Sequence, residues 1–119
     1  MKKFSLRARG QSFKYAFDGI TGFFQREHNA LLHALATLAV AVLALLLPVT
    51  RWEIIVLVLV TGLVWTAELF NTAIEKIMDF ISVKEHTEIK FIKDISAAAV
   101  LVTALIALVT GCLVFIPKL

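Results

Sequence analysis

The sequence predicts an all-α integral membrane protein with three transmembrane helices and an N-terminal surface helix. Hydrophobic residues fill 60% of the 119 positions, and the mean hydropathy of +0.88 is far above that of soluble proteins. Three apolar runs approach or exceed the ~20 residues that a helix needs to cross the hydrocarbon core. A chain of this length forms one domain, so we expect residues 1–119 to make up a single membrane domain.

The N-terminal segment is basic, with six of the twelve Lys and Arg residues. Phe13 and Phe17 recur at helical spacing, whereas Lys14 occupies another face. This pattern is typical of an amphipathic helix in the headgroup layer, which we expect over about residues 5–26. We interpret the two phenylalanines as membrane anchors and not as a base-stacking platform, and we expect no nucleic-acid partner.

Three apolar segments are the predicted spans. The first covers about residues 29–47 and is stopped by Pro48, which disfavours a continuing helix. The second covers about 54–80, because the helix is expected to continue beyond the hydrocarbon. A charged connection over 81–92 then leads to the third span, at about 95–116.

Lys and Arg are distributed unequally between the two ends of these spans. They gather in the N-terminal segment and in residues 76–93, and Arg51 and Lys118 alone lie at the opposite ends. Cytoplasmic loops of membrane proteins carry an excess of Lys and Arg. We therefore expect the N-terminus and residues 76–93 in the cytoplasm and the C-terminus outside.

A stripe of polar side chains follows the second span. Glu68, Asn71, Glu75 and Asp79 fall within roughly 80° of arc on a helix. Glu68 lies about 21 Å along the span, inside the nominal hydrocarbon, where an ionisable group is by default a functional hypothesis. A solvated helix end is the alternative, but such a face usually mixes cations with its acids, and Lys76 falls off the stripe.

These side chains suit phosphoryl transfer at the membrane surface. Glu27, Glu75 and Asp79 offer the hard oxygen atoms that Mg²⁺ prefers. Lys93 is a cation suited to phosphate oxygens, and Glu68 is placed to act as a base on a hydroxyl at headgroup depth. A metal, a phosphate-binding cation and a base are the parts that phosphoryl transfer requires. The residues alone therefore favour a membrane phosphotransferase.

Other interpretations of the same residues stay open. Glu27 would also favour a helix start electrostatically, and Lys93 and Asp94 would also serve as a juxtamembrane charge and a helix N-cap. In a small ion-coupled transport protein, Glu68 and Glu75 would form the ion path, although no inverted repeat supports this. In a noncatalytic assembly subunit, the stripe would join helices.

Several strings of the sequence resemble one family. ELFNTAIEKIMD, which contains the polar stripe, is followed fourteen residues later by KDISAAAVLV. The pair closely resembles the signature of the small prokaryotic diacylglycerol kinases. The N-terminal SFKYAFDGI and the E-x-N-x-x-x-H pattern that begins at Glu27 resemble the family's undecaprenol kinase branch. The resemblance covers about residues 12–119.

The resemblance implies a lipid kinase that transfers the γ-phosphate of ATP, with Mg²⁺, to the hydroxyl of a membrane lipid. It also implies a homotrimer in the bacterial cytoplasmic membrane, with active sites shared between subunits. Glu68 would be the catalytic base, and Glu27 and Glu75 would bind the metal. Contacts with the nucleotide are implied for Tyr15, Glu27, Asn71, Glu75, Asp79, Glu85, His86, Lys93 and Asp94.

Contacts with the lipid substrate are expected at Arg7, Arg9, Ser12, Asn29 and Glu68. The family usually has an arginine where this chain has Ala8, so either flanking arginine is a candidate for that role. The chain also has Ser-Ala-Ala-Ala-Val after Lys93, Asp94 and Ile95, where the undecaprenol branch usually has Ala-Ala-Gly-Ala-Val.

The acceptor is predicted from the side chains around the expected lipid site. Diacylglycerol offers ester carbonyls to hydrogen-bond donors, whereas a polyprenol offers an apolar chain. The N-terminal part of the sequence supplies mostly Phe and Leu there, with few neutral donors beyond Ser12, Thr21 and Asn29. We therefore expect undecaprenol as the preferred acceptor and diacylglycerol as the alternative.

The orientation is tested by a reporter that is active only in the cytoplasm. Fused after Leu119 it should give no signal, because the charge distribution places the C-terminus outside. The same reporter fused to the N-terminus is the control and should be active. A strong signal from the C-terminal fusion would place the C-terminus in the cytoplasm and contradict the orientation.

Overall fold

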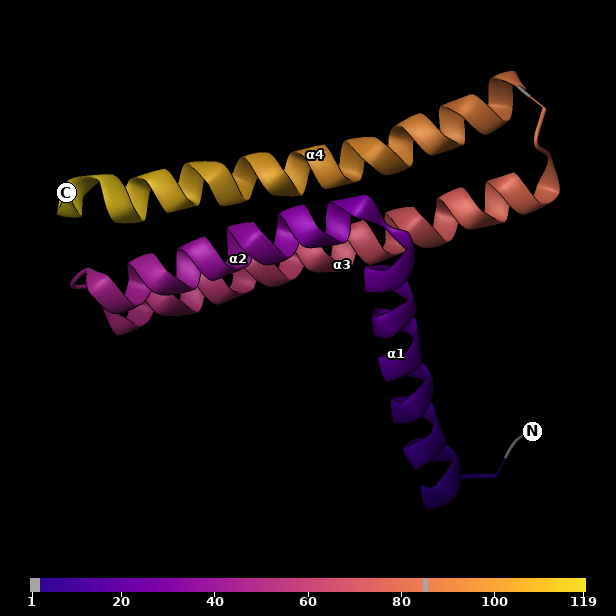
Figure 1. Cartoon of the computed structure of the whole chain (residues 1–119), viewed down its shortest axis with the longest axis horizontal. Helices are drawn as coiled ribbons and strands as arrows, with labels where there is room; N and C mark the ends of the chain where they lie inside the picture. Colours follow the sequence, from indigo (N-terminus) through magenta and orange to yellow (C-terminus); the bar gives the residue numbers. More distant parts are fainter. Residues whose placement is uncertain (1–2, 85) are drawn as a thin grey trace. The chain divides into compact units, whose positions relative to one another are not determined.

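The computed structural model describes residues 3–84 and 86–119, and the described part is helical with no β-strand. The all-α prediction is thereby confirmed. Three of the helices are long and apolar enough to cross a membrane, as expected from the sequence. The elements (Figure 1) are α1 (Leu6–Arg26), α2 (His28–Leu46), α3 (Arg51–Ile81), α4 (Thr87–Phe115) and the short 3-10 helix η1 (Ile116–Lys118).

The chain divides into two compact units, the first ending at Ala34 and the second beginning at Leu35. In the first unit, Ser5 caps α1 by accepting a hydrogen bond from the Ala8 N–H at 3.4 Å. Phe13 and Phe17 are largely exposed on this helix, which agrees with an amphipathic helix at a lipid surface. Extended backbone at Glu27 ends the helix and separates it from α2.

In the second unit, α3 and α4 run antiparallel and lie side by side (Figure 1). At one end, Leu57 packs against Val114 and Phe115 of α4. Beyond these side chains, Lys118 forms an ion pair with Glu53 at 3.0 Å. Polar contacts join the two helices toward the other end, so the pair is held at both ends.

The start of α3 is defined by a capping box. The Thr50 hydroxyl accepts from the Glu53 N–H at 3.2 Å, and the Glu53 carboxylate accepts from the Thr50 N–H at 3.1 Å. This exchange satisfies two N–H groups that a helix start leaves without partners. The helix consequently begins at Arg51, before the apolar run that was used to predict the span.

The connection between α3 and α4 is shorter than expected, because α4 begins at Thr87. His86 caps this helix, its Nδ1 accepting from the Glu88 N–H at 3.2 Å. Lys93 and Asp94 lie within α4 and do not cap it, so the N-cap interpretation of these two residues is wrong. The predicted start near residue 95 marks where the apolar part of α4 begins, and the charged first two turns of the helix were not recognised.

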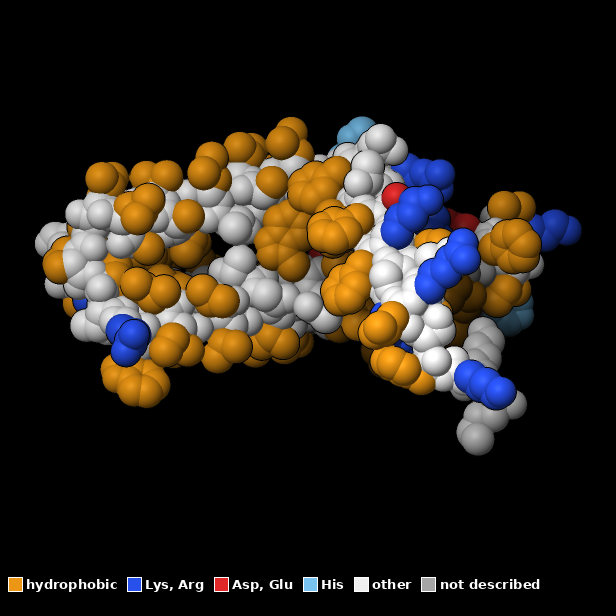
Figure 2. Space-filling view, turned by 90° about the horizontal axis from the view of Figure 1, so that it is seen from below, with side chains coloured by type: hydrophobic (Ala, Val, Ile, Leu, Met, Phe, Trp, Pro, Cys, Tyr) orange, Lys and Arg blue, Asp and Glu red, His pale blue; other side chains and the backbone are white. Residues whose placement is uncertain are grey.

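Apolar side chains cover much of the surface seen in Figure 2. Along α3, Leu69, Phe70 and Ile77 are exposed, whereas the buried side chains form one seam. These buried residues of α3 are Leu57, Val60, Val64 and Glu68. An exterior of this kind suits hydrocarbon, which has no affinity for polar groups.

A hydrogen bond joins α2 to α3 within the second unit. The Trp65 indole N–H donates to the Thr37 hydroxyl oxygen at 2.9 Å, and both side chains are half-buried. Interhelical hydrogen bonds of this kind contribute about 0.6 kcal/mol on average in membrane proteins.

We predict that Trp65→Phe and Thr37→Val destabilise the protein non-additively, because each variant breaks the same hydrogen bond. A double-mutant cycle measured by SDS-induced unfolding in mixed micelles should give a coupling energy of about 0.5–1 kcal/mol. The cycle compares the effect of each substitution in the wild type with its effect in the other variant. Strictly additive effects would show that the bond does not stabilise the packing of α2 on α3.

Candidate active site

The polar stripe of α3 continues the buried seam of the same helix. Glu68 is only 3% exposed, Asn71 and Glu75 are half-buried, and the Asp79 side chain is 54% exposed. Exposure therefore increases along the stripe from Glu68 to Asp79. A generic solvated helix end would expose all four residues, so the burial of Glu68 argues against that alternative.

Asn71 links the two helices through its side-chain amide. The Ser96 hydroxyl of α4 donates to the Asn71 Oδ1 at 2.7 Å. The Asn71 Nδ2 in turn donates to the Glu75 Oε1 at 3.4 Å, one helical turn further along α3. A buried serine, an amide and a carboxylate thus form one hydrogen-bonded chain.

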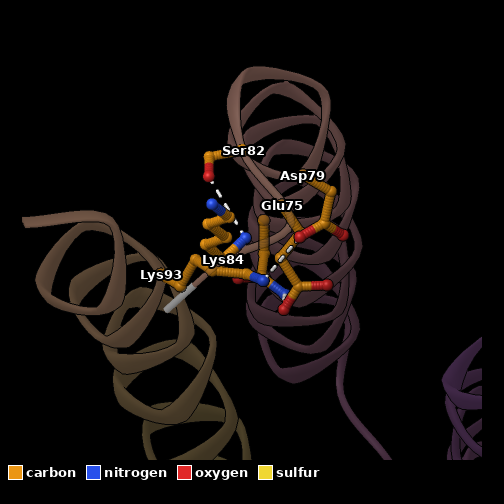
Figure 3. Close-up of polar contacts among 6 residues, drawn as sticks. Glu75, Asp79, Ser82, Lys84 and Lys93 are labelled. Carbon is orange, nitrogen blue, oxygen red and sulfur yellow. Dashed lines mark hydrogen bonds and ion pairs between the residues drawn. The ribbon is translucent and has the colours of Figure 1, made fainter. Parts of the chain in front are cut away.

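Lys93 extends from α4 toward the acidic end of the stripe (Figure 3). Its ammonium group donates to the Asp79 Oδ1 at 2.7 Å and also interacts electrostatically with Glu75. Lys90 and Asp94 pair with each other on an exposed face of the same helix. An exposed ion pair such as that of Lys93 and Asp79 contributes little net stability, about 0–1 kcal/mol. Lys93 can therefore exchange Asp79 for an anionic ligand at low cost.

The turn between the two helices lies beside this ion pair (Figure 3). Ser82 ends α3, and its hydroxyl accepts from the Lys84 N–H at 3.1 Å. His86 of the expected nucleotide segment is engaged in capping α4. Glu85 was also predicted to contact the nucleotide, and it lies outside the described residues.

The remaining predicted site residues belong to the first unit. Arg7, Arg9 and Tyr15 are exposed on α1, and the Ser12 hydroxyl donates to the Ala8 carbonyl of its own helix at 3.0 Å. Asn29 is exposed in the first turn of α2. Glu27 is half-buried at the end of α1. Its role as a helix-start residue is consistent with its position directly before α2.

The second unit brings five of the predicted residues together. Glu68, Asn71, Glu75 and Asp79 share one side of α3, and Lys93 faces the outer end of the stripe from α4. The sequence predicted the stripe from helical spacing alone. It did not reveal the contact of Ser96, which appeared in the sequence only as the first residue of the Ser-Ala-Ala-Ala-Val string. The available signal was a single hydroxyl side chain directly before three alanines, at the start of an apolar span.

The donor set fits Mg²⁺ bound together with a nucleotide. Among the described residues, no group of three or more His, Cys, Asp and Glu side chains could hold a metal ion by itself. Mg²⁺ usually takes one or two carboxylates and completes its shell with phosphate oxygens and water. Glu75 and Asp79, one turn apart, can supply such carboxylates.

Comparison with known proteins assigns the chain to a family. Residues 14–115 match the family described as prokaryotic diacylglycerol kinase. The chain is 38% identical over 109 residues to an undecaprenol kinase of Bacillus subtilis, a match that covers 92% of this chain and 89% of that protein. It is 35% identical over 109 residues to a diacylglycerol kinase of Synechocystis, covering 91% of this chain and 62% of that relative.

These matches agree with the all-α fold and its three long apolar helices. The chain therefore belongs to the prokaryotic diacylglycerol kinase family, and it is a multi-pass membrane lipid kinase, a phosphotransferase with an alcohol acceptor.

Proposed function

We propose that the protein transfers the γ-phosphate of Mg-ATP to the hydroxyl of undecaprenol, at the cytoplasmic face of the bacterial inner membrane. The observation that carries this proposal is the gradient of burial along one side of α3. It begins at the buried carboxylate of Glu68 and ends at the exposed Asp79–Lys93 ion pair. Such a gradient suits a reaction between a lipid in the membrane and a nucleotide in water.

Glu68 is the proposed base. Its carboxylate is 3% exposed and lies about three helical turns from Asp79 along α3. A lipid hydroxyl at headgroup depth would reach this level of the helix, whereas a water-soluble acceptor would not. Glu68 would take the proton from the hydroxyl as its oxygen attacks the γ-phosphorus atom, and ADP would leave with the bridging oxygen.

Lys93, Glu75 and Asp79 would bind the nucleotide at the outer end of the stripe. The Lys93 ammonium would leave Asp79 and contact phosphate oxygens, since an exposed ion pair costs little to break. Glu75 and the released Asp79 carboxylate would hold the metal, and the resemblance adds Glu27 as a further ligand. The bound metal would neutralise charge on the phosphate oxygens.

Undecaprenol is the favoured acceptor for two reasons. The Bacillus subtilis relative that is 38% identical is named an undecaprenol kinase. In addition, the Ser12 and Thr21 hydroxyls donate to carbonyls of their own helix, at 3.0 Å and 2.9 Å, so neither proton is directed at a substrate ester. Leu31, Leu32 and Leu35 present exposed apolar surface on α2. Diacylglycerol is the second candidate, after the Synechocystis relative's name.

The resemblance also supports a homotrimer with active sites shared between subunits. Extensive exposed apolar surface on the described helices is compatible with contacts to neighbouring subunits as well as to lipid. Glu27 and Glu68 would then come from the same subunit or from adjacent ones, and mixed oligomers of the two single variants would distinguish these arrangements.

Purified protein in mixed micelles should phosphorylate undecaprenol faster than diacylglycerol at matched surface concentrations. A site with few hydrogen-bond donors gains no binding energy from the ester carbonyls of diacylglycerol. Because an apolar site discriminates only weakly between lipids, some activity on diacylglycerol should remain. Initial rates with labelled ATP measure both activities. A preference of tenfold or more for diacylglycerol would reverse the choice of acceptor, and no lipid-dependent transfer to either lipid would refute the proposed reaction.

Glu68→Gln should lower kcat by roughly 10²- to 10⁴-fold, the usual effect of losing a general base. Glutamine preserves the size of the side chain but is not a base of comparable strength. Glu88→Gln, an exposed acid in the first turn of α4, is the matched control and should retain activity. Turnover of Glu68→Gln near that of the wild type would remove Glu68 from the chemistry.

Glu75→Gln and Glu27→Gln should change the dependence of the rate on metal. Each substitution removes one charged oxygen donor, so saturation should require more Mg²⁺, and activity should partly recover at high Mg²⁺ or Mn²⁺. Titration of the initial rate with each metal provides the measurement. Wild-type metal profiles in both variants would exclude the two proposed ligand roles.

A further inference from the structure

Ser96 is a buried polar residue without a role in the reaction described above. Among the described residues, the buried polar or charged side chains are Glu68 and Ser96, and Ser96 is only 5% exposed. We propose that Ser96 is a positioning residue, which orients the Asn71 amide so that its NH₂ group holds the Glu75 carboxylate for Mg-nucleotide binding. This inference rests on the proposed nucleotide site.

The direction of the hydrogen-bonded chain follows from the chemistry of its members. A carboxylate can only accept hydrogen bonds, so Glu75 requires the NH₂ side of the Asn71 amide. The amide oxygen then faces Ser96, which donates to it at 2.7 Å. The Asn71 Nδ2 lies 3.4 Å from the Glu75 Oε1. Without the serine hydroxyl, the Asn71 amide oxygen would lose its hydrogen-bond donor from α4. The amide would then be held less firmly in the orientation that directs its NH₂ group at Glu75.

Ser96 differs from another hydroxyl on the same helix. The Thr103 hydroxyl donates to the Val100 carbonyl of α4 at 2.9 Å and makes a bond within its own helix. The Ser96 hydroxyl instead crosses to α3. The three alanines that follow Ser96 are exposed, so the serine is the member of this small-residue run that faces inward. A helix-packing role alone would be served equally by alanine.

The consequence for the enzyme is confined to binding. Glu75 lies about two turns from Glu68 along α3, and the hydrogen-bonded chain reaches Glu75 rather than the proposed base. Loss of the Ser96 hydroxyl should therefore raise the KM for Mg-ATP and the metal concentration needed for activity. Once both are saturating, kcat should stay near the wild-type value.

The test compares Ser96→Ala with Thr103→Val, which removes a hydroxyl of the same helix that does not cross to α3. Alanine is favourable in helices, so Ser96→Ala is expected to fold. The KM for Mg-ATP should rise roughly tenfold in Ser96→Ala, as expected for the loss of about one hydrogen bond, and remain unchanged in Thr103→Val. Mn²⁺ binding with a non-hydrolysable ATP analogue, followed by electron paramagnetic resonance, should weaken to a similar extent without any turnover.

A double-mutant cycle with Asn71→Ala adds a second measurement. If Ser96 acts through Asn71, the Ser96→Ala change should have little further effect on Mn²⁺ and nucleotide binding once the amide is gone. Equal losses from Ser96→Ala in both backgrounds would overturn the inference. The same cycle can be measured with Ser96→Cys, which keeps a weak donor of similar size, if the alanine variant does not assemble.

The outcomes separate this inference from the proposed function. A wild-type protein that phosphorylates lipid, together with a Ser96→Ala variant of unchanged KM and Mn²⁺ affinity, would refute the role of Ser96 and leave the kinase reaction standing. A wild-type protein without Mg²⁺- and ATP-dependent lipid phosphorylation would refute the proposed function itself. A fall in kcat at saturating Mg-ATP, with KM unchanged, would also contradict a positioning role toward Glu75.

Discussion

Polar side chains are costly in hydrocarbon, and this cost determines which side of α3 faces the rest of the protein. The seam that begins with Leu57, Val60 and Val64 continues at helical spacing into Glu68 and the polar stripe. If α3 were rotated about its axis, the stripe would face lipid and the exposed leucine and phenylalanine side chains would be buried. The same orientation of α3 therefore packs it against α4 and forms the candidate site.

The same pairing gives the candidate site its two environments. Near Ser96 and Asn71, the hydrogen bond between the helices is partly buried and should be rigid. At the outer end, the ion pair between Lys93 and Asp79 is exposed. A fixed inner part suits holding the Glu75 carboxylate in one place, and an exchangeable outer part suits the entry and release of a nucleotide.

The helices and the polar stripe could be predicted because both depend on local pattern. Hydropathy identified the three spans, and helical spacing placed Glu68, Asn71 and Glu75 on one side of α3. The early start of α4 was missed because a histidine cap gives a weaker signal than an apolar run. Contacts between helices could not be predicted in the same way. The Ser96–Asn71 bond depends on how far α4 is displaced along α3, a register that neither helix encodes alone. The roles of Arg7 and Arg9 rest on the resemblance, and Glu27 was identified only by the chemistry of its carboxylate. Helical periodicity does not relate these residues of the first unit to the stripe.

The proposed site requires Lys93 to exchange Asp79 for a phosphate group when the nucleotide binds. Solid-state NMR can measure the dipolar coupling between the ¹⁵N-labelled Lys93 ammonium and the ³¹P nuclei of a Mg²⁺-bound, non-hydrolysable ATP analogue in lipid bilayers. A coupling that indicates direct contact, and that disappears in Lys93→Gln, is the predicted result. No such coupling at saturating analogue, in a preparation that phosphorylates lipid, would contradict the proposed site.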